Sequence, residues 1–120
     1  MNYKKVYGSI IQKRIQNPLD NTEYREKHHI IPKSLGGDDN KTNLIYLTAK
    51  EHFICHALLA EMYEEGTNEW YKMNHAFMMM KAESETHDGH RYINSRLYEL
   101  KRKDFSKVMS YVQRGSKNSQ

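Results

Sequence analysis

Apolar residues at the start of the chain recur with the spacing of a helix. Between residues 3 and 16 they fall three or four positions apart, at Tyr3, Val6, Tyr7, Ile10, Ile11 and Ile15. This period predicts an amphipathic helix that buries one face. Asn17-Pro18 is expected to end the helix, because a residue that precedes proline favours extended backbone.

Two short stretches follow that predict β-strands. Residues 24–31 form the first candidate strand, closed by Pro32, and residues 43–47 form the second. The segment between them, residues 33–42, is turn-forming throughout and is expected to be an exposed loop. The pattern therefore predicts a two-stranded hairpin with a long connection.

Helical periodicity returns in the second half of the chain. Thr48 and Glu51 fit a capping box, in which each side chain bonds a backbone N–H of the other residue, and predict a helix to Tyr63. Residues 68–82 and 91–113 are expected to form two more helices. Their apolar stripes are Trp70, Met73, Phe77 and Met80 in the first helix, and Ile93, Leu97, Leu100, Phe105, Val108 and Val112 in the second.

These elements predict a single domain of the α+β class that is mostly helical. Its length of 120 residues is that of one ordinary domain. We expect an N-terminal helix and turn, a strand–strand–helix core, C-terminal helices joined by a loop at 84–90, and a frayed tail. The four parts span residues 1–23, 24–63, 64–113 and 114–120.

Composition narrows the class of protein. Hydrophobic residues make up 38% of the chain and charged residues 28%, which is typical of a soluble globular domain. No apolar run approaches the roughly 20 residues of a membrane span, and the N-terminus lacks the apolar core of an export signal. Cys55 is the only cysteine, so an internal disulfide is excluded and a cytoplasmic location is expected. We expect Cys55 to be buried rather than bound to a metal.

The net charge of +4 is unevenly distributed. Residues 1–33 carry a net charge of +4, residues 34–95 a net charge of −5, and residues 96–120 a net charge of +5. Basic flanks suit a polyanion such as nucleic acid, because lysine and arginine neutralise phosphates and release counterions. Charge alone leaves open whether these residues bind DNA or only form solvated helix faces.

Four histidines form the candidate chemical site. Side chains alternate between the two faces of a strand, so the adjacent His28 and His29 cannot share one task. His52 and His56 lie four positions apart on the capped helix, which stacks both imidazoles on one face for a single cation. If the hairpin packs against this helix, His28 supplies a third ligand. Three protein ligands leave coordination positions open, as in catalytic metal sites.

The residues around these histidines resemble the HNH, or ββα-metal, endonucleases, and look most like small phage-encoded members that include free-standing homing enzymes. The resemblance covers residues 24–63 and extends more loosely over 91–110. Spacing agrees as well: 14 residues from His29 to Asn43, nine from there to His52, and four to His56. The matching positions are the run Glu26 to Gly37 (EKHHIIPKSLGG), Asn43, Leu44, Leu47, Glu51, His52 and His56.

The resemblance implies a role for each matched polar residue. His29 matches the general base that takes a proton from the attacking water. Asn43 matches the middle residue of the motif, which braces the loop and helps to orient that base. His28 and His52 match metal ligands, and His56 matches the additional ligand of the histidine-rich branch. A neutral imidazole titrates near neutral pH and is suited to activate water.

One divalent metal ion is expected as the cofactor, and its identity stays open. Many members of the family carry aspartate at position 28 and asparagine at position 52, and these use Mg²⁺. The set of histidines in this chain is softer, which favours Zn²⁺, Ni²⁺, Mn²⁺ or Co²⁺. The resemblance implies double-stranded DNA as the substrate and the cytoplasm of the bacterial host as the location of a phage-encoded enzyme.

Basic residues near the site and on the last helix are candidate DNA contacts. The lysines that flank the histidines are Lys27, Lys33, Lys41 and Lys50. A second DNA-contacting surface on the last helix would comprise Arg91, Arg96, Lys101, Arg102 and Lys103. Trp70, Phe77 and the methionines are candidates for a homodimer face, but the sequence does not decide the oligomeric state. His75, His87 and His90 fall outside the motif and are expected to be surface or packing residues.

The sequence leaves other functions open. A metal-stabilised DNA-binding module without catalysis would need the same ligands, but it would not need the base, His29. A structural zinc protein with no role on nucleic acid, and a toxin nuclease domain of the same fold, are further alternatives. Cleavage of a plasmid in the presence of metal, with His29→Ala as the control, separates an endonuclease from a binding module.

Overall fold

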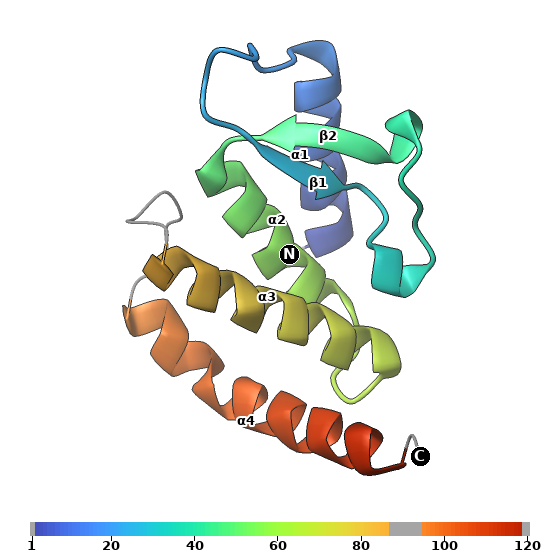
Figure 1. The fold of residues 1–120 in the computed structure, drawn as a ribbon, viewed down its shortest axis with the longest axis vertical. Helices are drawn as coiled ribbons and strands as arrows, with labels where there is room; N and C mark the ends of the chain where they lie inside the picture. Colours follow the sequence, from blue (N-terminus) through green and yellow to red (C-terminus); the bar gives the residue numbers. More distant parts are fainter. Residues whose placement is uncertain (1, 87–94, 119–120) are drawn as a thin grey trace.

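Among the residues that the structure describes, four α-helices and a two-stranded antiparallel hairpin form an α+β arrangement that is mostly helical (Figure 1). This computed structural model describes residues 2–86 and 95–118, with side chains described for 2–80 and 101–112. The elements are α1 (Tyr3–Gln16), β1 (Glu26–His29), β2 (Leu44–Leu47), α2 (Ala49–Met62), α3 (Asn68–Thr86) and α4 (Ser95–Asn118). Two turns of 3-10 helix, Lys33–Leu35 and Lys41–Asn43, lie in the loop between the strands.

Helix α1 confirms the helix predicted over residues 3–16. Asn2 caps it, since its Oδ1 accepts a hydrogen bond from the backbone N–H of Lys5 at 3.0 Å. Only Tyr7 and Ile11 of the predicted apolar stripe are buried, and Ile15 is exposed. The buried stripe of α1 is therefore narrower than its sequence period suggests.

The hairpin is shorter than predicted at both ends of its first strand. β1 pairs with β2 in antiparallel register from Glu26 opposite Leu47 to His29 opposite Leu44. Beyond that end, the Asn43 side chain bonds both the N–H and the C=O of Ile31 and so takes the place of a strand partner. At the other end the chain turns into α2 directly after Leu47, so the residues before Glu26 have no strand to pair with.

Helix α2 begins with the predicted capping box. The Thr48 hydroxyl accepts from the backbone N–H of Glu51, and the Glu51 carboxylate accepts from the backbone N–H of Thr48, both at 3.0 Å. These two bonds satisfy backbone donors that the first turn of a helix leaves without a partner.

Removal of the Thr48 hydroxyl therefore destabilises the fold. We expect Thr48→Ala to lower the free energy of unfolding by about 1 kcal/mol, measured by urea denaturation of the metal-free protein. Ser9→Ala is the control, because Ser9 is an exposed hydroxyl in the interior of α1. Equal unfolding midpoints for Thr48→Ala and wild type would contradict the capping role.

The last two helices are longer than their sequence suggests. α3 continues to Thr86, so residues 84–86 are helical rather than part of the predicted loop, whose remainder lies outside the described residues. α4 continues to Asn118, which replaces most of the predicted tail at 114–120. Serine, threonine and glycine inside a helix each cost only about 0.5–1 kcal/mol relative to alanine, and this does not oblige a helix to end.

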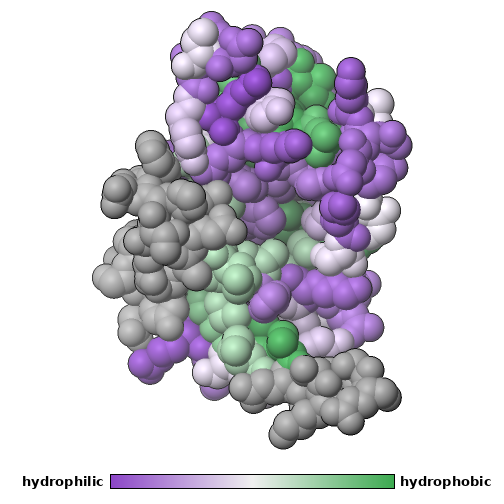
Figure 2. Space-filling view, in the orientation of Figure 1, coloured by the Kyte–Doolittle hydropathy of each residue, from purple (hydrophilic) through white to green (hydrophobic). Residues whose placement is uncertain are grey.

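Helix α2 lies at the centre of the fold, with the hairpin and α1 on one side and α3 and α4 on the other (Figure 1). One core cluster joins Ile11 of α1, Leu47 of β2 and Leu59 of α2, and a second joins Phe53 of α2 to Phe105 of α4. The hydropathy view shows mostly hydrophilic side chains at the hairpin end, with a hydrophobic patch among them, and apolar surface over α3 (Figure 2). No helix in the described part of the chain has both the length and the apolar character needed to cross a bilayer.

Most described residues of the predicted apolar stripes of α3 and α4 are buried, but not all of them. Trp70 and Phe77 are buried in the core of this chain itself, with 4% and 3% of their surface exposed, so they do not form an exposed dimer face. On α4, Phe105 and Val108 are buried as predicted, but Val112 is exposed. Of the methionines in this region, Met79 lies at the surface, with 48% exposed.

Candidate metal centre and its surroundings

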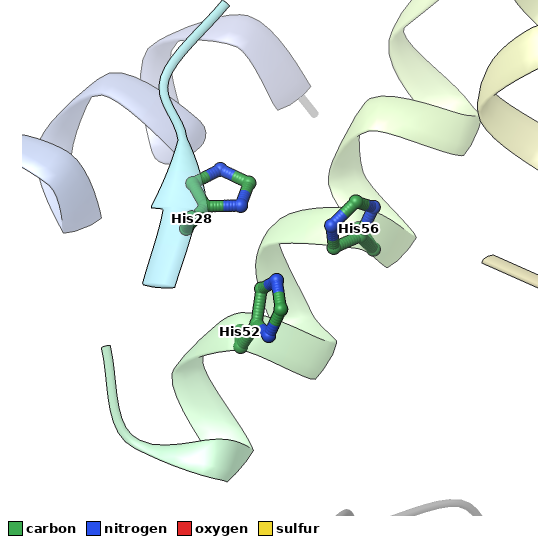
Figure 3. A group of neighbouring side chains, drawn as sticks. All are labelled: His28, His52 and His56. Carbon is green, nitrogen blue, oxygen red and sulfur yellow. The ribbon is translucent and has the colours of Figure 1, made fainter. Parts of the chain in front are cut away.

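Three histidines from two segments of the chain converge where the hairpin packs on α2 (Figure 3). His28 projects from β1, and His52 and His56 project from successive turns of α2. Their ring centroids lie 4.8–5.2 Å apart, and one nitrogen of each ring lies within 4.8 Å of the others. This separation fits a set of three nitrogen ligands for one cation after small rotations of the rings.

Tyr7 of α1 sets the tautomer of His28. Its hydroxyl donates to the backbone carbonyl of Ile30 at 2.7 Å, and the same oxygen lies 2.7 Å from Nε2 of His28. Because the only hydroxyl proton is directed at the carbonyl, Nε2 of His28 must carry a proton and donate it to Tyr7. The lone pair of neutral His28 therefore lies on Nδ1.

Glu26 acts on His52 in the same way. Its buried carboxylate lies 2.7 Å from Nδ1 of His52 and accepts a hydrogen bond from it. The lone pair of the His52 ring is thereby placed on Nε2. A metal-bound histidine commonly donates its other ring N–H to a carboxylate or another oxygen, which orients the ring and makes it a better ligand.

Burial keeps His28 in the form that binds a metal. Only 2% of His28 is exposed, and desolvation, followed by the neighbouring His56 and His52, lowers its pKa to about 2. A neutral imidazole is the form that donates a lone pair to an ion. Cys55 is buried as predicted, and desolvation raises the pKa of its thiol to about 12. Among the described residues, the cluster of converging histidines does not include Cys55.

His29 lies next to the cluster but does not belong to it. Its Nε2 lies 2.8 Å from Oδ1 of Asp39, whose other oxygen accepts from Nζ of Lys33 at 2.9 Å. The hydrogen bonds from His29 and Lys33 lower the pKa of Asp39 to about 2, so its carboxylate is ionised at neutral pH. Two adjacent histidines thus occupy different environments, as the alternation of side chains predicts.

Asn43 holds the loop that approaches His29. It is buried, although the sequence around it is polar. Its Nδ2 donates to the backbone carbonyls of Ile31 at 3.0 Å and of Asp38 at 2.8 Å, and its Oδ1 accepts from the N–H of Ile31 at 2.8 Å. The single side chain therefore ties the two ends of the 31–43 segment together.

Gly37 makes this close approach of backbone segments feasible. A Cβ atom at this position would lie 1.7 Å from the carbonyl oxygen of Ile31 and 2.9 Å from Nδ2 of Asn43. No side chain fits in that space. The preceding Gly36 has a φ of 100°, in the region that favours glycine. The pair of glycines in the motif thus has a steric explanation.

An open cavity of about 190 Å³ gives access to the histidines. Its lining residues are Lys27, His28, His29, Pro32, Lys33, His52 and His56. The side chains of Lys27 and Lys33 are exposed at this position. The cavity therefore presents nitrogen ligands, a fourth imidazole and two cationic side chains to a common space.

The remaining basic candidates fall into separate groups. Lys41 and Lys50 are exposed on the hairpin side of the molecule. Arg102 and Lys103 are exposed on α4, which lies beyond α3 as seen from the hairpin (Figure 1). Arg91 lies outside the described residues, and Arg96 lies in α4 with a side chain that is not described.

Lys101 differs from the expectation of a DNA contact. It is buried, and its ammonium group donates to Glu61 at 3.0 Å and to Asp104 at 3.2 Å. The contact with Glu61 connects α4 to α2, and the contact with Asp104 lies within α4. Lys101 therefore does not present a free ammonium group to a phosphate, because moving it to the surface would leave both carboxylates without their partner.

Three residues of this centre were not identified from the sequence as site residues: Tyr7, Glu26 and Asp39. Glu26 could have been found, because it lies two residues before His28 and so faces the same side of the strand. Tyr7 carried only the signal of an apolar helix position. Asp39 lies in a loop rich in polar residues, where nothing local distinguishes it from its neighbours.

The sequence is similar to several proteins of Enterobacteria phage T4 that are named probable mobile endonucleases. It is 41% identical to probable mobile endonuclease E over 99 residues, which cover 82% of this chain and 65% of that protein. It is 41% identical to endonuclease D over 114 residues, and 34% identical to endonuclease C over 122 residues. Those two matches cover 92% and 99% of this chain.

The similarity extends over part of each relative. The chain spans 42% of endonuclease D, 50% of endonuclease C and 65% of endonuclease E. No family model matches the sequence, and no solved structure matches it. Most of this chain is therefore matched in each comparison, but the match covers only about two fifths to two thirds of each phage protein.

Proposed function

We propose that this chain is a metal-dependent DNA endonuclease of the HNH, or ββα-metal, type, with its chemical centre in residues 24–63. One observation carries the proposal: His28, His52 and His56 converge as a ligand set while the adjacent His29 bonds a loop carboxylate instead. A purely structural metal site would have no use for that fourth imidazole. The names of the phage T4 relatives, probable mobile endonucleases, support the same reaction class.

The three converging histidines would hold one divalent cation. Such an ion supplies Lewis acidity, which stabilises the negative charge that develops on the phosphate and on the leaving oxygen during hydrolysis. Tyr7 and Glu26 support this role, because they fix the protons of His28 and His52 on the nitrogens that face the protein. The ligands are then ready to bind without a change of tautomer.

His29 would act as the general base. It takes a proton from a water molecule, whose oxygen attacks the phosphorus as the bond to the 3′-oxygen breaks, and the departing 3′-oxygen takes up a proton from solvent. The products are a 5′-phosphate and a 3′-hydroxyl. Because His29 does not belong to the ligand cluster, its ring retains a lone pair for this proton. Asn43 contributes indirectly by holding the loop next to His29.

Double-stranded DNA would approach the cavity from the hairpin side. Lys27 and Lys33 line the cavity and Lys41 and Lys50 are exposed nearby, which suits contacts to the phosphate backbone. The part of the chain that the structure describes holds one such centre, so a single chain would nick one strand. Cutting of both strands would require two chains or two successive nicks.

The test is conversion of a supercoiled plasmid to the open circular form. We expect nicking by the purified protein with added Mg²⁺, Mn²⁺, Ni²⁺ or Zn²⁺, and loss of nicking when a chelator removes the ion. Electrophoresis resolves the two plasmid forms. If the plasmid stays supercoiled with every ion, although the protein binds metal and DNA, the chain is a binding module and the proposed reaction is wrong.

A further inference from the structure

We propose that Asp39 is a positioning residue for His29: its carboxylate accepts the Nε2–H of His29 and so reserves Nδ1 as the atom that takes the proton from water. The inference rests on the proposed function, since it assigns a role within that same reaction. It also adds a residue that lies outside the matched histidines and asparagine.

The contacts of Asp39 define this role. Oδ1 lies 2.8 Å from Nε2 of His29, within hydrogen-bond distance, while Oδ2 accepts from Nζ of Lys33 at 2.9 Å. The two oxygens therefore have different partners, and the lysine contacts the oxygen that His29 leaves free. An ionised carboxylate only accepts hydrogen bonds, so the shared proton belongs to Nε2 of the imidazole.

The backbone around Asp39 is fixed by the motif asparagine. Asn43 donates to the carbonyl of Asp38, the residue immediately before Asp39, and to the carbonyl of Ile31, two residues after His29. Among the described residues no hydrogen bond joins Asn43 to the His29 ring itself. Asn43 therefore reaches the base by two routes: along the strand end at Ile31, and through the loop backbone that places Asp39 against the ring.

The chemistry favours this arrangement. A neutral imidazole carries one proton, and a carboxylate beside Nε2 keeps it there, which leaves the lone pair on Nδ1. When water transfers a proton to Nδ1, an O–H bond breaks, an N–H bond forms, and His29 becomes a cation. The negative charge of Asp39 stabilises that cation through a charge-assisted hydrogen bond. The proton later returns to solvent and restores the base.

The exposure of Asp39 makes the role testable. Its side chain is 66% exposed, so its ion pairs contribute little to the stability of the fold. Replacing it therefore leaves the protein folded. Asn40 offers a matched control, because it is the next residue of the same exposed loop and its side chain donates to Asp38 rather than to His29.

The first measurement follows the tautomer of His29 without any reaction. The side-chain nitrogen resonances of metal-free, ¹⁵N-labelled protein distinguish Nε2–H from Nδ1–H at mildly alkaline pH, and their loss in His29→Ala assigns them. We expect the Nε2–H form in wild type, Asn40→Ala and Asp39→Asn, and a mixture of both forms in Asp39→Ala. Asparagine keeps an oxygen acceptor, so Asp39→Asn is the conservative variant. An unchanged tautomer in Asp39→Ala would overturn the proposal.

The second measurement is the rate of plasmid nicking. We expect Asp39→Ala to lower kcat by about 10- to 100-fold, as loss of an outer-shell partner does, with a much smaller change in KM. Asp39→Asn should fall between Asp39→Ala and wild type, and Asn40→Ala should match wild type. A faster rate in Asp39→Ala would mean that the carboxylate blocks His29 and Lys33 from DNA, which also overturns the proposal.

The two measurements distinguish a failure of the proposed function from a failure of the role assigned to Asp39. If wild type nicks no plasmid, the proposed function fails, while the nitrogen resonances still report whether Asp39 sets the His29 tautomer. If wild type nicks the plasmid and Asp39→Ala does so equally well, the reaction stands and the role of Asp39 is refuted.

Discussion

His29→Ala is expected to abolish most DNA nicking while metal binding stays intact. His29 lies beside the cluster of three histidines without belonging to it, so its removal takes away the proposed proton acceptor and leaves the candidate ligands in place. General-base catalysis by a positioned side chain typically contributes a factor of about 10² to 10⁴ in rate. The measurement is the single-turnover rate of plasmid nicking with saturating metal, compared between variant and wild type.

Metal binding by the same His29→Ala protein is the control for that experiment. Titration calorimetry should give the variant a metal affinity within about threefold of wild type. Loss of a hydrogen-bond partner of a metal ligand typically lowers the affinity by about 10-fold or more, and His29 is not such a partner. Equal nicking rates for the variant and wild type would assign the reaction to another residue. Loss of both activity and metal binding would place His29 among the ligands instead.

His56→Ala is expected to lower the metal affinity by more than about 100-fold, because loss of a mere outer-shell partner already costs about 10- to 100-fold. His56 supplies one of the three converging nitrogens. An ion at 100 times its dissociation constant stabilises a folded protein by about 2.7 kcal/mol. The variant should therefore lose the rise in melting temperature that added metal produces in wild type.

His75→Ala is the matched control for the ligand experiment. His75 is a partly buried histidine on α3 that does not belong to the converging cluster. It should keep both the metal affinity and the thermal shift of wild type. If His56→Ala and His75→Ala respond to metal alike, the three-histidine cluster is not the site of binding.

The N-terminal helix, α1, contributes hydrogen bonds to this centre as well as buried apolar surface. Tyr7 bonds His28, and Arg14 of the same helix bonds Glu51, the capping residue next to His52, at 2.8 and 2.9 Å. Although desolvation opposes it, the hydrogen bond from Arg14 helps to lower the pKa of Glu51. Helix α1 thus supports the ligands on both the strand and α2.

The Tyr7 hydroxyl is suited to hold His28 at neutral pH. Tyr7 is buried, and burial raises the pKa of its hydroxyl far above its usual value, so the hydroxyl stays protonated and available as a donor to Ile30. The Arg14–Glu51 contact connects the end of α1 to the start of α2. The placement of the candidate ligands His28 and His52 is therefore supported by a segment that the motif itself does not include.

Local rules on the sequence determined the elements that carry the site. The period of apolar residues predicted α1, and the Thr48–Glu51 pair predicted the start of α2, because caps and amphipathic faces depend on neighbours within one or two turns. Spacing alone placed His52 and His56 on one helical face, and alternation separated His28 from His29. These inferences need no knowledge of how the elements pack.

Contacts between distant segments were decided only by the tertiary structure. Packing of the hairpin on α2 brings His28 to His52 and His56, and it also brings Glu26 to His52 across 26 residues. The same folding buries Lys101 against Glu61, which its basic neighbours did not suggest. Side-chain partners that are remote in the chain leave no periodic signal, because their meeting depends on the relative placement of whole elements.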